Sequence, residues 1–244
     1  MPTLLWKDPG LVKGSGFDNW RRVGPILPAI KVYNLRQVDE LIVVDIIATN
    51  ENREPDYQEI SDFSKECFVP LTVGGGIKNV ENVRKILGAG ADKVCINSAI
   101  FNNPKLISQI AQKFGSQCVV VSIDAKRIGD QYECFSHSGT KPVSISPTEL
   151  AKKAEKLGAG EILITSIERD GTMKGYDLEL ISRVVKAVSI PVIASGGAGN
   201  YKDMLKAIKA GASAVAAASI FHFTEQTPLE AKDYLRSKGV SVRY

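Results

Sequence analysis

Two stretches of this chain, Gly74-Gly75-Gly76-Ile77-Lys78-Asn79 and Ser195-Gly196-Gly197-Ala198-Gly199-Asn200, decide its fold because they resemble each other and start 121 residues apart, at 74 and 195. The same offset separates further pairs along the chain: Glu40 from Glu161, Gly90-Ala91 from Gly211-Ala212, and Asn97-Ser98 from Ala218-Ser219. A constant offset over several separate elements indicates an internal repeat. The sequence therefore predicts two similar halves joined in one chain.

Short apolar runs alternate along both halves with amphipathic stretches of helical pattern, such as residues 79–87 and 147–157. Apolar strands separated by helices are typical of a parallel sheet that is covered on both faces. Eight such units predict a (β/α)8 TIM barrel, a single domain over residues 1–244 built from two similar half-barrels. The expected strands are Thr3–Lys7, Glu40–Ile46, Leu71–Val73, Lys93–Ile96, Cys118–Ile123, Glu161–Ser166, Val192–Ala194 and Ala214–Ala217.

Composition narrows the function. The chain has 244 residues, 44% of them hydrophobic and 24% charged, with a net charge of +4. Its lysines and arginines are dispersed, which favours a small anionic metabolite over nucleic acid. No apolar stretch is long enough to cross a membrane, and no signal peptide is recognisable. The four cysteines form no CxxC pair, so we expect reduced thiols in a cytoplasmic protein without a metal site or a cofactor.

Each half carries the elements of a phosphate site. Glycine allows the backbone to approach an anion closely, so that successive N–H groups can point at phosphate oxygens. Gly74–Gly76 and Gly196-Gly197 follow the third and seventh expected strands. Asn97-Ser98 and Ala218-Ser219 follow the fourth and eighth, each at the start of a short helix that favours an anion. Two sites across one barrel mouth predict a substrate with two phosphates or one long enough to reach both.

From about Lys7 to Arg243 the chain resembles the cyclase subunit of imidazole glycerol phosphate synthase. The resemblance rests on the following stretches: Asp39-Glu40-Leu41, Thr72–Ile77, Ala91–Val94, Phe114–Gln117, Ile123–Arg127, Gly158–Ile162, Arg169–Thr172 and Ala194–Gly199. That family takes ammonia from a partner glutaminase, conducts it through the barrel and uses it on a bisphosphorylated ribonucleotide. The products are imidazole glycerol phosphate and an aminoimidazole carboxamide ribonucleotide.

The resemblance implies roles for particular residues. One phosphate would be held by Gly76, Asn97 and Ser98, and the other by Asp170, Gly171, Gly197, Ala218 and Ser219. Lys13 matches a lysine on the family's mobile first loop, which covers the substrate. Glu40, Lys93 and Glu161 match three members of the charged ring that gates the ammonia path on the barrel floor, and the fourth member, an arginine, would precede Met1. The glutaminase contacts this same face.

The chain departs from the family at one of two catalytic aspartates, which end the first and fifth strands and act as general acid and base. Asp124 matches the aspartate of strand five. Leu5, in Thr3-Leu4-Leu5-Trp6, stands where the family has the aspartate of strand one. A leucine can neither accept nor donate a proton, and losing one acid/base group typically slows a reaction by about 10²–10⁴-fold. We therefore expect weak cyclase activity.

Three functions remain open. A branch of the family associated with sugar amidation in surface polysaccharide synthesis also reads Leu-Leu in strand one. The chain resembles that branch best, as the synthase subunit of a glutamine amidotransferase that passes ammonia to a phosphorylated or nucleotide-linked sugar, with a sugar ligase as a further partner. The second is the cyclase of histidine biosynthesis itself, a lyase, and the third is a non-catalytic scaffold that only conducts ammonia. The resemblance to the related barrel isomerase is weaker.

Overall fold

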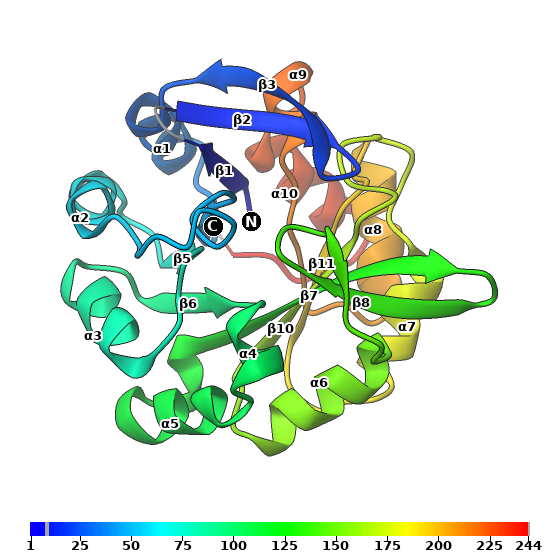
Figure 1. Cartoon of the computed structure of the whole chain (residues 1–244). Coiled ribbons are helices and arrows are strands. Elements are labelled where there is room, and N and C mark those ends of the chain that lie inside the picture. Colours follow the sequence, from blue (N-terminus) through cyan, green and yellow to red (C-terminus); the bar gives the residue numbers. More distant parts are fainter. Residues whose placement is uncertain (8–9, 244) are drawn as a thin grey trace.

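The computed structural model describes residues 1–7 and 10–243, and its central parallel sheet closes into a barrel (Figure 1). Hydrogen-bonded neighbours run in the order β12-β11-β10-β7-β6-β5-β4-β1. Closure occurs beside β12, where Thr3 N–H donates to the Ala217 carbonyl at 2.9 Å and Ala217 N–H donates to the Met1 carbonyl at 3.0 Å. The closed sheet leaves its first and last strands without an open edge, as the (β/α)8 fold requires.

All eight expected barrel strands are present in the described residues. They are β1 (Thr3–Lys7), β4 (Leu41–Asp45), β5 (Leu71–Gly74), β6 (Lys93–Ile96), β7 (Val119–Ile128), β10 (Glu161–Ser166), β11 (Val192–Ser195) and β12 (Ala214–Val215). The bounds differ from expectation mainly at β7, which continues past Ile123, and at β12, which ends before Ala217. Cys118 lies outside β7, in the short 3₁₀ helix Ser116–Cys118.

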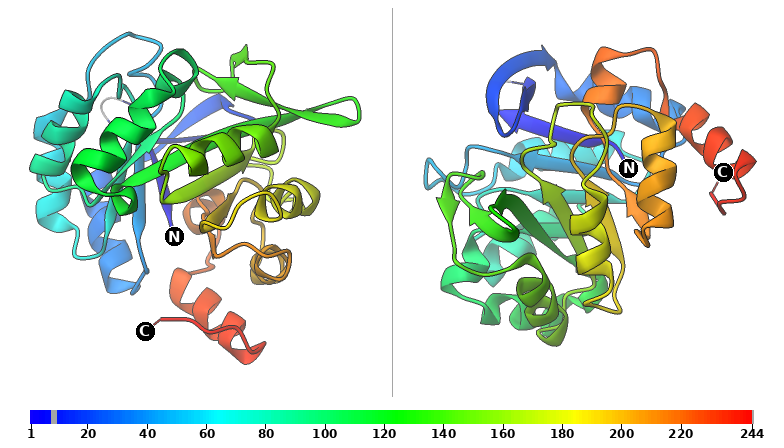
Figure 2. Two further views of the ribbon diagram at one scale, coloured as in Figure 1. Left: turned by 90° about the horizontal axis from the view of Figure 1, so that it is seen from below. Right: turned by 90° about the vertical axis from the view of Figure 1, so that its right-hand side faces the viewer.

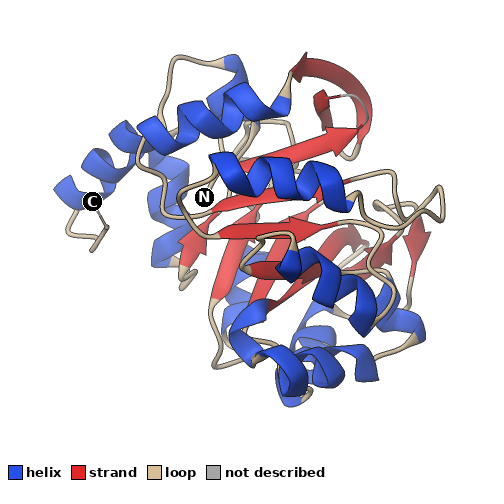
Figure 3. Ribbon diagram, turned by 90° about the vertical axis from the view of Figure 1, so that its left-hand side faces the viewer, coloured by secondary structure: helices blue, strands red, loops and turns tan. Residues whose placement is uncertain are grey.

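Helices cover the outside of the barrel (Figure 3). The longer ones are α1 (Ile26–Leu35), α2 (Tyr57–Glu66), α3 (Val80–Gly88), α5 (Lys105–Phe114), α6 (Pro147–Lys156), α7 (Leu178–Val185), α8 (Tyr201–Lys209) and α10 (Pro228–Ser237), and the short ones are α4 (Ala99–Asn102) and α9 (Ser219–Phe223). Several begin at a side-chain cap: Ser146 forms a capping box with Glu149 at the start of α6. Such a cap stabilises a helix by about 1 kcal/mol.

The two half-barrels repeat each other in backbone detail. The left-handed φ angles of Gly75 and Gly76, 106° and 69°, recur at Gly196 and Gly197, 88° and 107°. The Asn79 side chain caps α3 by accepting a hydrogen bond from Asn82 N–H, and Asn200 caps α8 in the same way. The repeat predicted from the sequence is therefore also a repeat of turn geometry.

Two hairpins that the strand pattern did not predict rise over the carboxyl ends of the barrel strands. β2 (Gly10–Ser15) and β3 (Asp18–Gly24) form the first, so Lys13 lies in a strand rather than in an irregular loop. The second is made by the extension of β7 with β8 (Gln131–Ser136), which also pairs with the two-residue β9 (Lys141–Pro142). Both termini lie at the opposite end of the barrel from these hairpins (Figure 2).

Side-chain alternation in the strands divides the core into two parts. In β1, Leu4 and Trp6 point outward, and Trp6 packs edge-on against Phe63 of α2 with ring centroids 5.7 Å apart. The barrel itself is filled by inward-facing residues of five strands and by the residue that follows β12: Ile42, Cys95, Val120, Leu163, Ile193 and Ala216. In the part of the chain that the structure describes, no helix has the length and apolar character needed to cross a membrane.

Candidate active site

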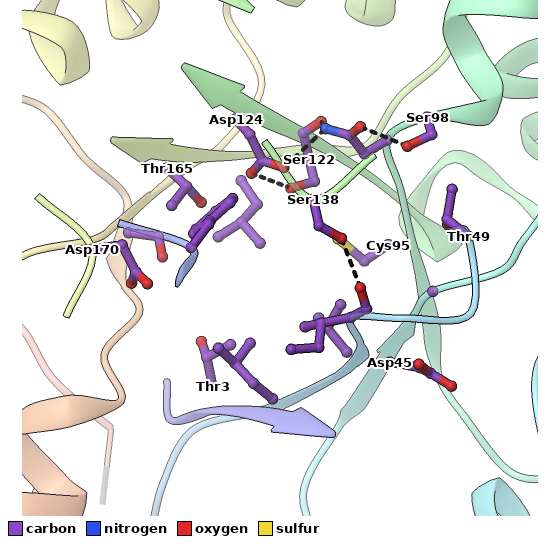
Figure 4. Close-up of a pocket in the computed structure, with 18 of the residues that line it drawn as sticks. Thr3, Asp45, Thr49, Cys95, Ser98, Ser122, Asp124, Ser138, Thr165 and Asp170 are labelled. Carbon is purple, nitrogen blue, oxygen red and sulfur yellow. Dashed lines mark hydrogen bonds between the residues drawn. The ribbon is translucent and has the colours of Figure 1, made fainter. Parts of the chain in front are cut away.

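A cavity of about 340 Å³ opens at the carboxyl ends of the barrel strands (Figure 4). Its wall includes every residue that the sequence assigned to phosphate binding or catalysis, from both halves of the chain: Lys13, Gly76, Asn97, Ser98, Asp124, Asp170, Gly171, Gly197, Ala218 and Ser219. Leu5 also lines it. The structure thus brings together residues that lie more than 200 positions apart, although their functions stay predictions.

Asp124 reaches the cavity from β7, and two polar side chains hold its carboxylate. Asn97 Nδ2 donates to Oδ2 at 3.2 Å, and the Ser122 hydroxyl lies 3.5 Å from Oδ1. Burial, joined by the negative charge of Asp170 and opposed by the hydrogen bond from Ser122, raises the pKa of Asp124 to about 7. A carboxyl group with this pKa can both donate and accept a proton near neutral pH.

Lys13 and Asp170 form a buried ion pair between the first hairpin and the turn after β10. The Nζ–Oδ2 distance is 2.5 Å, and the Lys13 side chain is only 2% exposed. Gly16 N–H also donates to the Asp170 carbonyl at 2.9 Å. A Cβ on Gly171 would lie 2.1 Å from the Gly14 carbonyl oxygen, so only glycine allows this close approach. These contacts therefore hold the hairpin against one side of the cavity.

The glycine turns are equally tight on both sides. A Cβ on Gly76 would lie 2.9 Å from the Arg53 carbonyl oxygen, and one on Gly197 would lie 2.3 Å from that of Gly175. Ser98 accepts a hydrogen bond from His137 N–H at 2.9 Å. In contrast, the buried Ser219 hydroxyl has no hydrogen-bond partner among the described residues. An unpartnered buried hydroxyl that faces a cavity is suited to a polar ligand.

Leu5 faces the cavity because it alternates with the outward residues Leu4 and Trp6. It pairs in register with Val44 of β4, whose side chain lines the cavity as well. This part of the wall is therefore apolar. On the other side, Thr165 of β10 lies in register with Asp124 and lines the same cavity (Figure 4).

The three residues assigned to the gate meet at the opposite end of the barrel. Lys93 Nζ lies 2.8 Å from Glu40 Oε2 and 2.7 Å from Glu161 Oε1. Burial lowers the pKa of Lys93, but the hydrogen bonds to Glu161 and Glu40 outweigh it, so the net pKa is raised and the ammonium stays charged. These charges close the narrow end of the barrel, beneath the apolar layer around Cys95.

Sequence reasoning missed the cavity residues that the hairpins contribute. Phe17 and Trp20 come from the first hairpin, and His137 and Ser138 follow β8. Ser138 Oγ donates to the Ile46 carbonyl at 2.7 Å, which fixes this segment over the mouth (Figure 4). Thr165 could have been found, because it ends a predicted strand as Asp124 does. His137 gave no comparable signal, since its hairpin was not predicted.

Four free cysteines are seen, two of them buried, and the described residues contain no group of three or more histidine, cysteine, aspartate or glutamate side chains arranged to hold a metal ion. Cys95 lies in the barrel interior, where burial and the charge of Asp124 raise its pKa to about 12. A thiol with so high a pKa stays protonated at neutral pH and is a poor nucleophile.

Comparison with known proteins agrees with the geometry. The family model described as "Histidine biosynthesis protein" matches residues 1–227. The imidazole glycerol phosphate synthase subunits HisF of Pelodictyon phaeoclathratiforme and Chlorobium phaeovibrioides are each 48% identical over 244 residues, which cover 100% of this chain and 97% of each relative. That of Exiguobacterium sibiricum is 46% identical over 243 residues, covering 100% of this chain and 98% of the relative.

The family match spans nearly the whole chain, and the relatives are similar to it from end to end, including the elements that form the cavity and the floor. With the closed barrel and its paired glycine turns, this establishes that the chain belongs to the HisF family, the cyclase subunits of imidazole glycerol phosphate synthase.

Proposed function

We propose that this protein is the barrel subunit of a glutamine-dependent synthase, which adds ammonia to a substrate carrying two phosphates. The observation that carries the proposal is the pairing of two glycine-rich turns across one cavity that also contains Asp124. Backbone N–H groups in left-handed turns bind anions, and the turns of both half-barrels can engage one phosphate each. Asp124 then lies on the cavity wall between the anchored ends of the substrate.

The floor supports a source of ammonia outside the barrel. Lys93, Glu40 and Glu161 are only 14–20% exposed and form one ion-paired cluster across the narrow end. Opening this cluster would give ammonia access to the apolar layer of the barrel interior, which separates the floor from the mouth. A glutaminase docked on the floor would release ammonia there, away from bulk water that would protonate it. We therefore propose a heterodimer with a glutaminase.

The first candidate reaction is that of the relatives, the cyclase step of histidine biosynthesis, because every relative compared carries that name. It requires acid and base groups at the mouth. Asp124, with a pKa of about 7, can serve as one of them. The apolar wall at Leu5 offers no second carboxylate from β1, so we expect this reaction to be slow.

Leu5 favours a second candidate, amidation of a sugar for surface polysaccharide. This reaction also joins ammonia to a carbonyl carbon, but it need not require the acid/base carboxylate that β1 supplies in the cyclase reaction. A separate sugar ligase would then complete the pathway. The comparisons favour the cyclase, and the sugar-amidation candidate rests on Leu5 alone.

Ligand titration tests the binding part of the proposal. Calorimetry with the bisphosphorylated ribonucleotide should show one binding event that Gly76→Asp and Gly197→Asp each weaken by at least tenfold, because each adds a carboxylate beside one phosphate. Gly88→Asp is the matched control, since Gly88 ends α3 with open space around its Cα. Unchanged affinity in both cavity variants would refute the two-phosphate site.

A coupled assay tests the ammonia source. The protein is mixed with a HisH-type glutaminase, and substrate consumption is followed with glutamine or with ammonium chloride. Glutamine should support turnover only when both subunits are present, whereas ammonium chloride should support it with this protein alone. Absence of turnover under both conditions, for the ribonucleotide and for the sugar substrate, would leave the scaffold function as the better account.

A further inference from the structure

Among the described residues, six acidic or basic side chains line the cavity: Lys13, Asp45, Lys78, Asp124, His137 and Asp170. Four of them have strong polar partners. Lys13 and Asp170 pair with each other, Asp45 pairs with Arg53 at 2.9 Å, and Lys78 Nζ donates to the Asn52 carbonyl at 2.8 Å. Asp124 and His137 are left as the two groups that can exchange protons with a substrate.

The His137 ring is positioned by its own hairpin. Its Nδ1 lies 3.0 Å from the Ser136 hydroxyl, and its backbone N–H donates to Ser98 Oγ. His137 lines the cavity, and no hydrogen bond to its Nε2 is seen among the described residues. His137 and Ser138 both have left-handed φ angles, 52° and 56°, a strained conformation for two successive residues other than glycine.

We propose that His137 is a catalytic general base of this enzyme, working together with Asp124 as general acid when ammonia adds to a carbonyl carbon of the substrate. The inference rests on the proposed function, because it requires ammonia to be consumed at this mouth. It does not depend on which of the two candidate substrates is used, since both reactions begin with the same addition.

The step balances without any further reactant. Ammonia forms a C–N bond to the carbonyl carbon, and the neutral His137 Nε2 takes a proton from the attached nitrogen. Asp124 gives its proton to the oxygen, which yields a carbinolamine. After the imidazolium has returned its proton through water to the Asp124 carboxylate, the same two groups move a second proton from the nitrogen to the hydroxyl, so that the C–O bond breaks with loss of water and a C=N bond forms. The imidazolium then again returns its proton through water to the Asp124 carboxylate, which restores both groups. No electrons are exchanged with an oxidant or reductant.

The electrostatics favour these roles and not the reverse ones. Burial and the nearby Lys141 lower the pKa of His137, whereas the pKa of Asp124 is raised to about 7. The lowered pKa of His137 favours the neutral imidazole, and the raised pKa of Asp124 favours the protonated carboxyl, as the roles require. Lys141 of β9 is the charge that acts on His137, and Ser98 at the start of α4, which accepts its N–H, is uncharged. Asp124 of β7 and the ion-paired Asp45 at the end of β4 line the same cavity.

His137 also accounts for how a mouth with Leu5 can retain activity. The family places its second catalytic carboxylate on β1, where this chain has an apolar side chain. His137 lines the same cavity from the turn between β8 and β9 instead. We infer that it supplies the residual reaction, from a position that suits the family's ribonucleotide less well than β1 does.

The direct test is the pH dependence of turnover with the ribonucleotide and ammonium chloride, with rates expressed per free ammonia. The wild type should give a bell-shaped profile, with an acidic limb from protonation of His137 and an alkaline limb from ionisation of Asp124. His137→Gln should lower kcat at least tenfold, leave KM within about threefold and remove the acidic limb alone. Lys141→Gln should move the acidic limb to higher pH. A His137→Gln variant with wild-type rate and profile would overturn the inference.

A second readout does not depend on turnover. The chain contains two histidines, and burial lowers the pKa of His222 to about 4, so the imidazole resonances of His137 can be followed separately by NMR. Saturation with the ribonucleotide should shift both the resonances and the titration midpoint of His137. If His137 does not respond, the imidazole does not meet the substrate. If it responds but no ammonia is consumed with either substrate, the proposed function fails, and the assignment of His137 as base fails with it.

A double variant distinguishes catalysis from a merely structural role. Leu5→Asp restores a carboxylate on β1, so His137→Gln should cost much less in the Leu5→Asp background than in the wild type. A structural role for His137 would produce the same loss in both backgrounds, and that result would also overturn the inference.

Discussion

Replacing Asp124 by asparagine should stabilise this protein at alkaline pH. The carboxyl group has a pKa of about 7 in the folded protein, against 3.8 for its ordinary value, because burial and Asp170 oppose its ionisation. The folded state therefore binds more protons than the unfolded state between these two values. Stability should fall as pH rises through this window and level off above about pH 7.

The size of the effect follows from the two pKa values. A difference of about 3 units, at 1.36 kcal/mol per unit, corresponds to at most about 4 kcal/mol. Asparagine carries no charge, and its amide oxygen can still accept the hydrogen bond from Asn97. Asp124→Asn should thus match the wild type near pH 4 and exceed its free energy of unfolding by up to about 4 kcal/mol at pH 8.

Urea denaturation at pH 4 to 9 measures this difference, with kcat recorded on the same samples. The control is Asp170→Asn, which leaves the buried Lys13 ammonium without its anionic partner and should destabilise by about 3–5 kcal/mol. Asp124→Asn should lose about 10²–10⁴-fold in kcat while gaining stability. If Asp124→Asn is less stable than the wild type at pH 8, or the difference does not vary with pH, the raised pKa is wrong.

Two further predictions concern the glycine turn of the second half-barrel and the floor. Gly197→Ala should destabilise the protein by about 1–3 kcal/mol in thermal denaturation, because its φ of 107° is unfavourable for alanine and its Cβ would lie 2.3 Å from the Gly175 carbonyl oxygen. The control Gly88→Ala, in open space, should be neutral or slightly stabilising. Equal effects of the two substitutions would contradict this prediction. Lys93→Met should leave Glu40 and Glu161 without their cation and uncouple glutamine hydrolysis from synthesis in the heterodimer, while turnover with ammonium chloride persists. The raised pKa of Lys93 means that its ion pairs form below the ordinary pKa of 10.5 and are lost only at higher pH. The wild type should therefore stay coupled between pH 6 and 9.

The barrel and its two phosphate turns could be predicted because their signals are local. Each strand is a short apolar run, and glycine is nearly obligatory at the left-handed positions of Gly76 and Gly197. The repeat at a constant offset then related the two halves without any knowledge of contacts. Predictions of this kind need only a few neighbouring residues.

The hairpins could not be predicted in the same way. None of the residues of β3 is fully buried, and its sequence lacks the alternation of apolar and polar residues that identifies a strand. Lys13 looked like a loop residue, yet it is buried against Asp170, which lies 157 positions away. His137 enters the cavity only because β8 pairs back onto β7. These placements depend on long-range packing, which no local pattern records.

We propose that this barrel consumes ammonia at a mouth where Leu5 stands at the position of the family's β1 carboxylate. The most direct test is the kcat for the ribonucleotide with saturating ammonium chloride, compared between the wild type, Leu5→Asp and the HisF subunit of Chlorobium phaeovibrioides. The account predicts slow turnover by the wild type and an increase of about 10²–10⁴-fold in Leu5→Asp, or about 3–6 kcal/mol in the barrier, with little change in KM. Wild-type turnover equal to that of the relative, with no gain in Leu5→Asp, would contradict it.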